Sequence, residues 1–504
     1  MRQRYLVPGA AALCLLLAAP AFAATPEPGA PGMGDPYYPD YGNGGYDVSH
    51  YDLRLAYQPK TDQLDGTATL TATTTQDLSR FDLDFALDVS SVLVDGHRAA
   101  FARSGDHELQ ITPAQPLAKG QEITVVVRYS GVPSSVQAEG FTSWQRTPDG
   151  GVAANEPESA WWWFPSNDHP RDKATYDVSV TVPDGTQAIS NGTLQSTSSQ
   201  LGRTRYNWRE DKPQATYLAT LAVGRFDITT GKTDSGIPVT NAVSKDLGAN
   251  TGAAKASVGR TSEIIDWEST LFGPYPFSAV GGYVPNVPTH YAVETQTRPF
   301  YSPAQFADGA NPSVIVHELA HQWFGDCVSV ENWRDIWVNE GFATYAQWLW
   351  SEKEGEGSAR DLAAYTYAQH PADDAFWTVK PGDPGADKQF DDAVYDRGAM
   401  ALQALRQKTG DKVFFKILRS WTTERRYGNG SVQDFRRLAS RVSGKDLGRL
   451  FTDWLFTPAR PKAPASWQPD AAPRSTLAGP VKPKSWEQIR TARTGHRAAV
   501  PAPR

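Results

Sequence analysis

Alternating apolar and polar residues mark the first half of the chain as β structure. The alternation has a period of two residues in three segments, residues 51–57, 81–85 and 176–182. Asp95-Gly96 and Asp184-Gly185 are turn signals between such segments. A Gly-, Thr- and Asp-rich connection at residues 229–236 ends this region, so we predict a β-rich N-terminal domain over residues 46–232.

A helical period replaces the alternation in the second half of the chain. Apolar residues recur at helical spacing in six segments, residues 253–271, 312–324, 335–353, 393–407, 412–418 and 432–442. A short sheet is expected near Val239 and residues 281–284. The sequence therefore predicts an α+β multidomain protein, in which a mostly helical domain over residues 233–460 follows the β-rich domain.

The two ends of the chain have a different composition. Residues 24–45 are rich in Pro, Gly and Tyr without periodicity, and residues 461–504 are rich in Pro, Ala and basic residues. We predict a flexible lead-in and a flexible, positively charged tail.

Residues 1–23 have the pattern of a secretory signal peptide. Arg2 and Arg4 precede an apolar run over residues 10–19, and Ala21-Phe22-Ala23 matches a small-residue cleavage site. No segment reaches eighteen apolar residues, so no membrane span is predicted. We expect a secreted, periplasmic or extracellular protein.

Charge and cysteine content narrow the choice of partners and ligands. The net charge of −7, with basic residues gathered in the tail, leaves an acidic body that argues against a nucleic-acid partner and is compatible with cationic groups such as free amino termini. Cys14 lies in the predicted signal, which leaves Cys327 as the only thiol. Any metal is therefore left to histidine and carboxylate ligands.

The segment His317-Glu318-Leu319-Ala320-His321 carries the strongest chemical signal. Residues four apart share one face of a helix, so both imidazoles can reach one ion while Glu318 lies beside it. The pentad alone also arises by chance in ordinary helices. Glu340, near the start of the next predicted helix, supplies a third ligand, and three ligands with one open position are the catalytic zinc pattern. We predict one Zn²⁺ per chain, with Glu318 as the base that takes a proton from zinc-activated water.

Several segments together resemble the aminopeptidase N-like gluzincins, a zinc metallopeptidase family. The resemblance covers roughly residues 45–460, and the segments that carry it are Glu156-Pro157, residues 164–168, 172–176, 291–295, the zinc motif with Glu340, and residues 395–398. It implies a saddle-like β-rich domain packed on a thermolysin-like catalytic domain. It also implies removal of one residue at a time from peptides with a free amino terminus. We expect a secreted bacterial member without the large C-terminal helical domain of longer members.

The resemblance also implies roles for three further residues. Glu156 and Glu294 correspond to the acidic residues that hold the substrate's amino group, and such an anchor lets only the first peptide bond reach the metal. Tyr395 corresponds to the tyrosine that stabilises the oxyanion. The sequence departs from the family's Gly-Ala-Met-Glu-Asn motif with Tyr291, Val293 and Thr295, which bears on side-chain preference.

Other readings of the same residues stay open. A zinc endopeptidase would share the metal site and ignore the amino terminus, whereas a non-catalytic peptide-binding protein would use the β domain and Trp161-Trp162-Trp163. We interpret that tryptophan run as packing between domains. Asp335 and Asn339 are candidates to orient the zinc-binding histidines. The sequence leaves the oligomeric state undetermined, and a monomer is expected.

Overall fold

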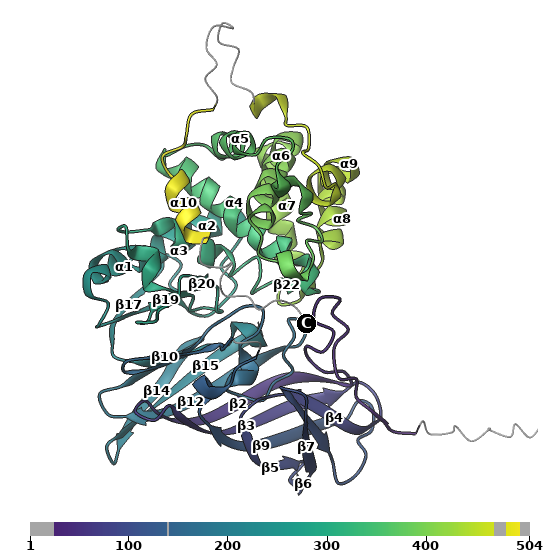
Figure 1. The fold of residues 1–504 in the computed structure, drawn as a ribbon, viewed down its shortest axis with the longest axis vertical. Helices are drawn as coiled ribbons and strands as arrows, with labels where there is room; N and C mark the ends of the chain where they lie inside the picture. Colours follow the sequence, from purple (N-terminus) through teal and green to yellow (C-terminus); the bar gives the residue numbers. More distant parts are fainter. Residues whose placement is uncertain (1–24, 139–140, 468–479, 494–504) are drawn as a thin grey trace, which may run out of the picture.

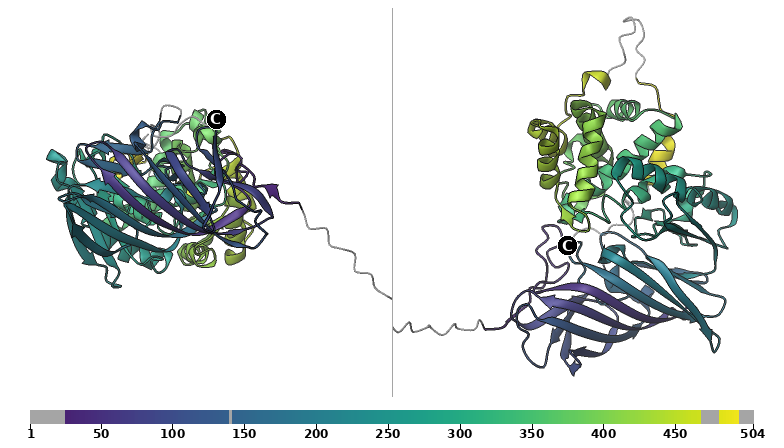
Figure 2. Two further views of the ribbon diagram at one scale, coloured as in Figure 1. Left: turned by 90° about the horizontal axis from the view of Figure 1, so that it is seen from below. Right: turned by 180° about the vertical axis from the view of Figure 1, so that it is seen from behind.

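The strand-rich and helical halves of the protein are stacked end to end (Figure 1). This computed structural model describes residues 25–138, 141–467 and 480–493, so the predicted signal peptide lies outside the described residues. The views from below and behind show the strand-rich half covering one end of the helical half (Figure 2). The predicted α+β architecture is confirmed.

An eight-stranded sheet forms the main body of the N-terminal domain, in the order β14-β15-β12-β2-β3-β9-β5-β6. Its strands are β2 (Tyr46–Gln58), β3 (Gln63–Thr74), β5 (Asp88–Val94), β6 (His97–Arg98), β9 (Glu122–Gly131), β12 (Lys173–Pro183), β14 (Thr193–Gln200) and β15 (Arg203–Ala215). Buried and partly exposed residues alternate along the whole of β12, as the sequence predicts. One face of this sheet therefore contributes to the core.

Two four-stranded sheets complete the N-terminal domain, in the orders β1-β4-β8-β7 and β10-β11-β16-β13. Their strands are β1 (Glu27–Pro28), β4 (Leu78–Asp84), β7 (Ala100–Ser104), β8 (Glu108–Thr112), β10 (Trp144–Thr147), β11 (Gly150–Ala153), β13 (Gln187–Ser190) and β16 (Leu221–Gly224). The alternation predicts β4 correctly, but Asp82 and Asp84 are each only 1% exposed. Both faces of β4 are therefore covered.

The three tryptophans at residues 161–163 are buried within the N-terminal domain. The Trp162 ring packs against Phe141, and its Nε1 donates to the Val136 carbonyl at 3.3 Å. Trp163 belongs to a core cluster that covers the β domain and extends to Tyr283 and Phe300 of the second half of the chain. The run is therefore packing, and the ring contacts and hydrogen bonds of Trp162 lie inside the β domain.

A five-stranded sheet, in the order β17-β18-β19-β21-β20, begins the second half of the chain. Its strands are β17 (Phe226–Lys232), β18 (Pro238–Ser244), β19 (Val280–Val284), β20 (Ala292–Val293) and β21 (Phe300–Tyr301). β17 pairs with β18 along its whole length, although the prediction assigned β17 to the N-terminal domain. Alternation of apolar and polar residues predicts a strand, but it does not predict the sheet to which that strand belongs.

Helices dominate the rest of the described chain. They are α1 (Thr251–Val258), α2 (Thr261–Phe272), α3 (Pro312–Ala320), α4 (Trp337–Glu354), α5 (Ala359–Gln369), α6 (Gly398–Thr409), α7 (Asp411–Glu424), α8 (Val432–Ser443), α9 (Gly448–Phe451) and α10 (Trp486–Arg493). A small parallel pair, β22 (Ser329–Val330) and β23 (Asn429–Gly430), lies between them. The helix predicted over residues 253–271 is two helices, because the chain turns at Gly259 and Arg260.

The lead-in and the tail are more closely packed than their composition predicts. In the lead-in, Asp35 accepts a hydrogen bond from the Trp333 backbone at 2.8 Å, and Tyr38 donates to Gln389 at 2.9 Å. In the tail, Trp486 and Ile489 of α10 are buried, and α10 lies beside α3 (Figure 1). A few aromatic and aliphatic side chains anchor segments that are otherwise rich in Pro and Gly.

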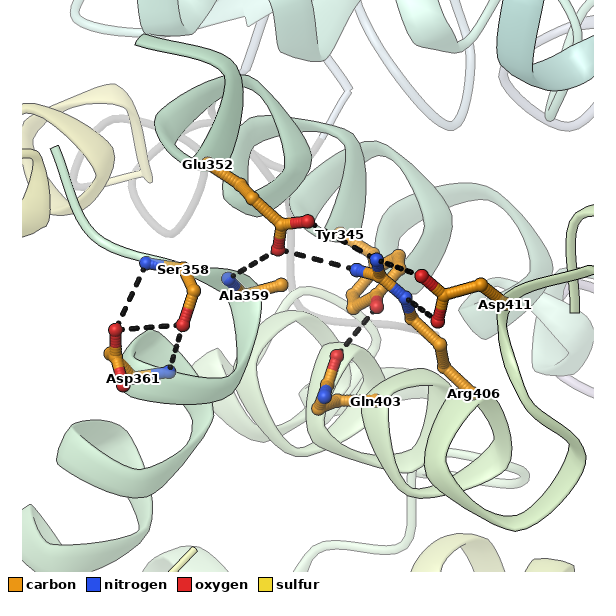
Figure 3. Close-up of polar contacts among 8 residues, drawn as sticks. All are labelled: Tyr345, Glu352, Ser358, Ala359, Asp361, Gln403, Arg406 and Asp411. Atoms are coloured by element: carbon orange, nitrogen blue, oxygen red, sulfur yellow. Dashed lines mark hydrogen bonds and ion pairs between the residues drawn. The ribbon is translucent and has the colours of Figure 1, made fainter. Parts of the chain in front are cut away.

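Polar contacts at the C-terminal end of α4 tie it to the neighbouring helices (Figure 3). Arg406 of α6 contacts Glu352 of α4 at 3.1 Å and Asp411 of α7 at 2.9 Å. Glu352 also accepts a hydrogen bond from the Ala359 backbone at 3.0 Å, where a Ser358 capping box begins α5. One guanidinium therefore joins three helices.

Replacement of this guanidinium should destabilise the helical domain. We expect Arg406→Met to lower the free energy of unfolding by about 1 kcal/mol, because Glu352 and Asp411 lose their shared partner while the aliphatic packing is kept. Arg449→Met is the matched control, since the Arg449 side chain is 94% exposed and should give almost no change. Urea unfolding of both variants measures the difference, and equal stabilities would contradict a role for this network.

Candidate metal centre

Helix α3 presents two histidines to one point. The Asn311 side chain caps the helix by accepting from the Val314 backbone at 3.3 Å. The helix ends at Ala320 and not at the predicted Phe324, but His321 keeps helical dihedral angles (φ −59°, ψ −24°). The two imidazoles therefore stay one turn apart, with ring centroids 4.9 Å from each other.

Helix α4 places the third predicted ligand against both imidazoles. Glu340 Oε2 lies 3.1 Å from His317 Nε2 and 3.5 Å from His321 Nε2, and all three side chains are buried. Ligand atoms at 2.0–2.1 Å from a tetrahedral zinc ion lie about 3.4 Å apart. His317, His321 and Glu340 thus fit one zinc ion.

The charge state of Glu340 suits a metal ligand. Burial raises the pKa of this carboxyl, but the adjacent His321 and His317 outweigh burial and hold the pKa well below its usual range. The carboxylate is therefore ionised at neutral pH.

The second nitrogen of each histidine has an oxygen partner that fixes its orientation. His317 Nδ1 lies 3.1 Å from Gln347 Oε1, and His321 Nδ1 lies 3.0 Å from the Phe324 carbonyl. An amide or carbonyl oxygen only accepts, so both Nδ1 atoms carry the proton and both Nε2 atoms are left for the metal. Gln347 is itself held by Ser313, whose Oγ accepts from Nε2 at 2.9 Å.

The sequence pointed to other residues for this orienting role. Asp335 instead accepts a hydrogen bond from the Val432 backbone at 2.9 Å, and Asn339 makes no side-chain hydrogen bond within the described residues. Gln347 was missed, although it lies seven residues after Glu340 and so shares its helix face. A spacing of seven residues from Glu340 is the sequence signal that could have predicted Gln347.

The predicted base and one predicted amine ligand lie beside the metal ligands. Reactive atoms of Glu318, Glu294 and His321 lie within 4.8 Å of one another. Neither oxygen of Glu318 has a hydrogen-bond partner among the described residues, while Glu294 accepts from the Tyr217 hydroxyl at 3.0 Å. Burial raises the pKa of Glu318 well above its usual value.

Glu156 reaches the same region from the N-terminal domain, in the loop that follows β11. It is 6% exposed, and burial followed by the charges of Glu294 and Glu340 raises its pKa. Glu156 therefore lies within electrostatic range of Glu294 and Glu340.

Tyr395 lies next to the metal ligands on a single π-helical turn, Ala393–Arg397. Its ring is nearly parallel to that of His317, with centroids 6.2 Å apart. Burial, and then the charge of Glu340, raise the pKa of the phenol, so it stays a proton donor. Arg397 fixes the turn by donating to the carbonyls of Trp377 and Trp454, both at 2.7 Å.

The three residues that depart from the family motif are all buried. The Tyr291 hydroxyl donates to the Ala154 carbonyl at 3.3 Å, and its ring packs near Phe300 at 5.6 Å. Val293 belongs to the core cluster that both halves of the chain share, and Thr295 donates to the Arg298 carbonyl at 2.6 Å. The Tyr291 side chain is therefore taken up by core packing.

The β-rich domain, the helical domain and the His-His-Glu centre together indicate a zinc metallopeptidase. Residues 48–218 match the Peptidase M1 N-terminal domain, and residues 301–454 match the Peptidase family M1 domain. The chain belongs to the M1 peptidase family.

Solved structures of similar size match most of the chain. A mutant M1 zinc metallopeptidase from Deinococcus radiodurans, bound to a Tyr-Ser-Ala substrate, is 29% identical with a TM-score of 0.77, and the match covers 87% of this chain and 100% of that one. A two-domain M1 zinc metallopeptidase mutant bound to L-tryptophan is 30% identical with a TM-score of 0.76, covering 86% and 99%.

Curated relatives are longer. Aminopeptidase M1 of Arabidopsis thaliana is 28% identical over 60% of this chain and 36% of its own length. Probable aminopeptidase 1 of Saccharolobus solfataricus is 26% identical over 59% of this chain and 40% of its own length. The chain thus spans about two fifths of these relatives.

Among the described residues, no helix is long and apolar enough to cross a membrane.

Removal of the Gln347 amide should weaken metal binding without removing a ligand. We expect Gln347→Ala to lower zinc affinity about 10–100-fold, because His317 loses the acceptor that fixes its tautomer. Competition with a chromophoric chelator measures this affinity. Gln347→Glu, which keeps an acceptor at this position, is the matched control and should retain tight binding; unchanged affinity in Gln347→Ala would contradict the orienting role.

Proposed function

We propose that this protein is a zinc aminopeptidase that removes single residues from the amino termini of peptides. The observation that carries the proposal is the position of two buried carboxylates, Glu156 and Glu294, beside a His-His-Glu centre. Burial and mutual repulsion raise the pKa of Glu156, so a cation between them is favoured. The ammonium group of a peptide supplies that cation.

Each residue of the site has a distinct part in the proposed reaction. When bound by His317, His321 and Glu340, zinc supplies Lewis acidity and lowers the pKa of a coordinated water to about 7. Glu318 takes the proton of the attacking water and passes it to the leaving amine.

Tyr395 and the amine-binding carboxylates serve binding and charge stabilisation. The Tyr395 hydroxyl donates to the carbonyl oxygen as negative charge develops there. Glu156 and Glu294 hold the ammonium group. This places the first peptide bond at the metal and prevents cleavage at bonds further along the peptide.

Relatives support the substrate class. The Deinococcus radiodurans mutant is bound to Tyr-Ser-Ala, and two-domain mutants are bound to L-arginine and to L-tryptophan. A protein of the same two-domain size therefore accommodates a short peptide and single amino acids. We further infer that the signal pattern in residues 1–23 directs export and that the enzyme acts as a monomer on extracytoplasmic peptides.

Replacement of the base should stop turnover and leave the metal in place. We expect Glu318→Gln to lower kcat on an amino-acid arylamide by about 100-fold or more, because the carboxamide cannot accept the proton of water. Zinc content, measured on the same preparation, should match the wild type since Glu318 is not a ligand. A fully active variant would rule out this base, and with it the proposed reaction.

Blocking the substrate's amino group tests the exopeptidase register. We expect an N-acetylated aminoacyl arylamide to be cleaved far more slowly than the free form, because Glu156 and Glu294 then have no ammonium to bind. Glu294→Gln should lower kcat/KM for the free substrate about 10–100-fold, the loss of one charged hydrogen bond. Equal cleavage of blocked and free substrates would instead identify a zinc endopeptidase.

A further inference from the structure

A second group of metal-binding side chains is buried in the N-terminal domain. It consists of Asp84, His107 and Glu108, whose potential ligand atoms lie within 4.8 Å of one another. Asp84 ends β4 and Glu108 begins β8, where the two residues are direct antiparallel partners. Asp84 is 1% exposed and Glu108 is 9% exposed. Two carboxylates are therefore opposed across a sheet with little access to solvent, an arrangement that repulsion disfavours.

His107 lies between these carboxylates. Its Nε2 is 3.6 Å from Asp84 Oδ1 and 3.7 Å from Glu108 Oε1, close to the ligand spacing in the His317, His321 and Glu340 centre. The Asp40 carbonyl lies 3.3 Å from the same nitrogen. One imidazole, two carboxylates and a carbonyl thus face one point.

Several oxygens at this point accept no well-formed hydrogen bond from the described residues. Asp84 Oδ2 accepts from Asn43 Nδ2 at 3.2 Å and from the Asp168 backbone at 2.7 Å. By contrast, Asp84 Oδ1, both carboxylate oxygens of Glu108 and Asn43 Oδ1 are buried and accept no well-formed hydrogen bond from the described residues. Buried oxygens without donors are costly, so a ligand that they can coordinate is favoured.

The surrounding charge is also negative. Asp82 and Asp168 are buried nearby, and the neighbouring guanidinium of Arg80 pairs with Asp82 at 3.2 Å. Either protons or a cation must offset these carboxylates.

We propose that Asp84, His107 and Glu108 bind a second divalent cation, Zn²⁺ or Mn²⁺, with the Asp40 carbonyl as a further ligand. A cation accounts for the convergence of these buried carboxylate oxygens and for the imidazole that lies between them. The imidazole favours a first-row transition metal over Ca²⁺, which takes six to eight oxygen ligands.

This cation joins the lead-in to the sheet of β4 and β8, behind the amine-binding loop. The His107 ring packs 5.3 Å from the Trp161 ring, and Trp161 Nε1 donates to Glu158 Oε2 at 2.7 Å. Glu158 lies two residues after Glu156. The site therefore has a structural role, and its occupancy should stabilise the N-terminal domain without taking part in hydrolysis.

Metal content distinguishes the two sites. The full-length wild type, His321→Ala, Glu108→Gln and the double variant are equilibrated separately with Zn²⁺ and Mn²⁺, freed of unbound ions and measured by mass spectrometry. We expect about two ions per chain in the wild type with at least one of these metals, about one in each single variant and almost none in the double variant. Glu122→Gln, an exposed carboxylate on β9, is the matched control and should equal the wild type.

Two further measurements detect the second metal ion without relying on enzyme activity or on variants that could fail to fold at this site. Bound metal should raise the melting temperature of His321→Ala, and anomalous diffraction from the wild type should give a peak among Asp84, His107 and Glu108. One ion per chain in the wild type, none in His321→Ala and no second anomalous peak with either metal would overturn the proposal. The carboxylates would then be neutralised by protons.

Discussion

Buried carboxylates that need positive charge determine how this molecule is organised. Around the metal centre Glu340 faces two imidazoles, which hold its pKa low, whereas burial raises the pKa values of Glu318, Glu294 and Glu156. Four acidic groups within one water-poor region repel one another strongly. In the proposed mechanism, a divalent metal and a substrate ammonium are the two cations that relieve this repulsion, so the same electrostatic cause favours the binding of both.

The metal ligands could be predicted because helix geometry fixes them. Residues four apart on α3 stay on one face whether the helix ends at Ala320 or Phe324, so the error in the predicted boundary moved no ligand. The partners of the histidines were harder to predict. A backbone carbonyl such as that of Phe324 has no sequence signature, and Gln347 is one of several polar residues on α4 until the packing of α3 against α4 is known.

Composition predicted a flexible lead-in and a flexible tail, and this was less accurate. Composition is an average over a segment, so it does not show that single residues within the segment are buried. Tyr38 and Trp486 are buried in segments where Pro, Gly and Ala dominate, and they fix those segments to the catalytic domain. Strand β4 shows a related limit. Alternation places Asp82 and Asp84 on the face opposite Phe81 and Leu83, but only the tertiary structure shows that this second face is also covered.

Exopeptidase register depends on how the two domains meet. In the proposed mechanism Glu294 shares a domain with the metal ligands, whereas Glu156 arrives from the other domain, two residues after the Ala154 carbonyl that accepts from Tyr291. The lead-in spans the same junction, because Asp35 accepts from the Trp333 backbone in the catalytic domain while it contacts His169 in the β domain. The candidate zinc ligands lie on α3, at its C-terminal cap and on α4, so small shifts between the domains would displace Glu156 without disturbing the metal. In the proposed mechanism the chemistry is thus built into one domain, and the choice of the first peptide bond is a property of the interface.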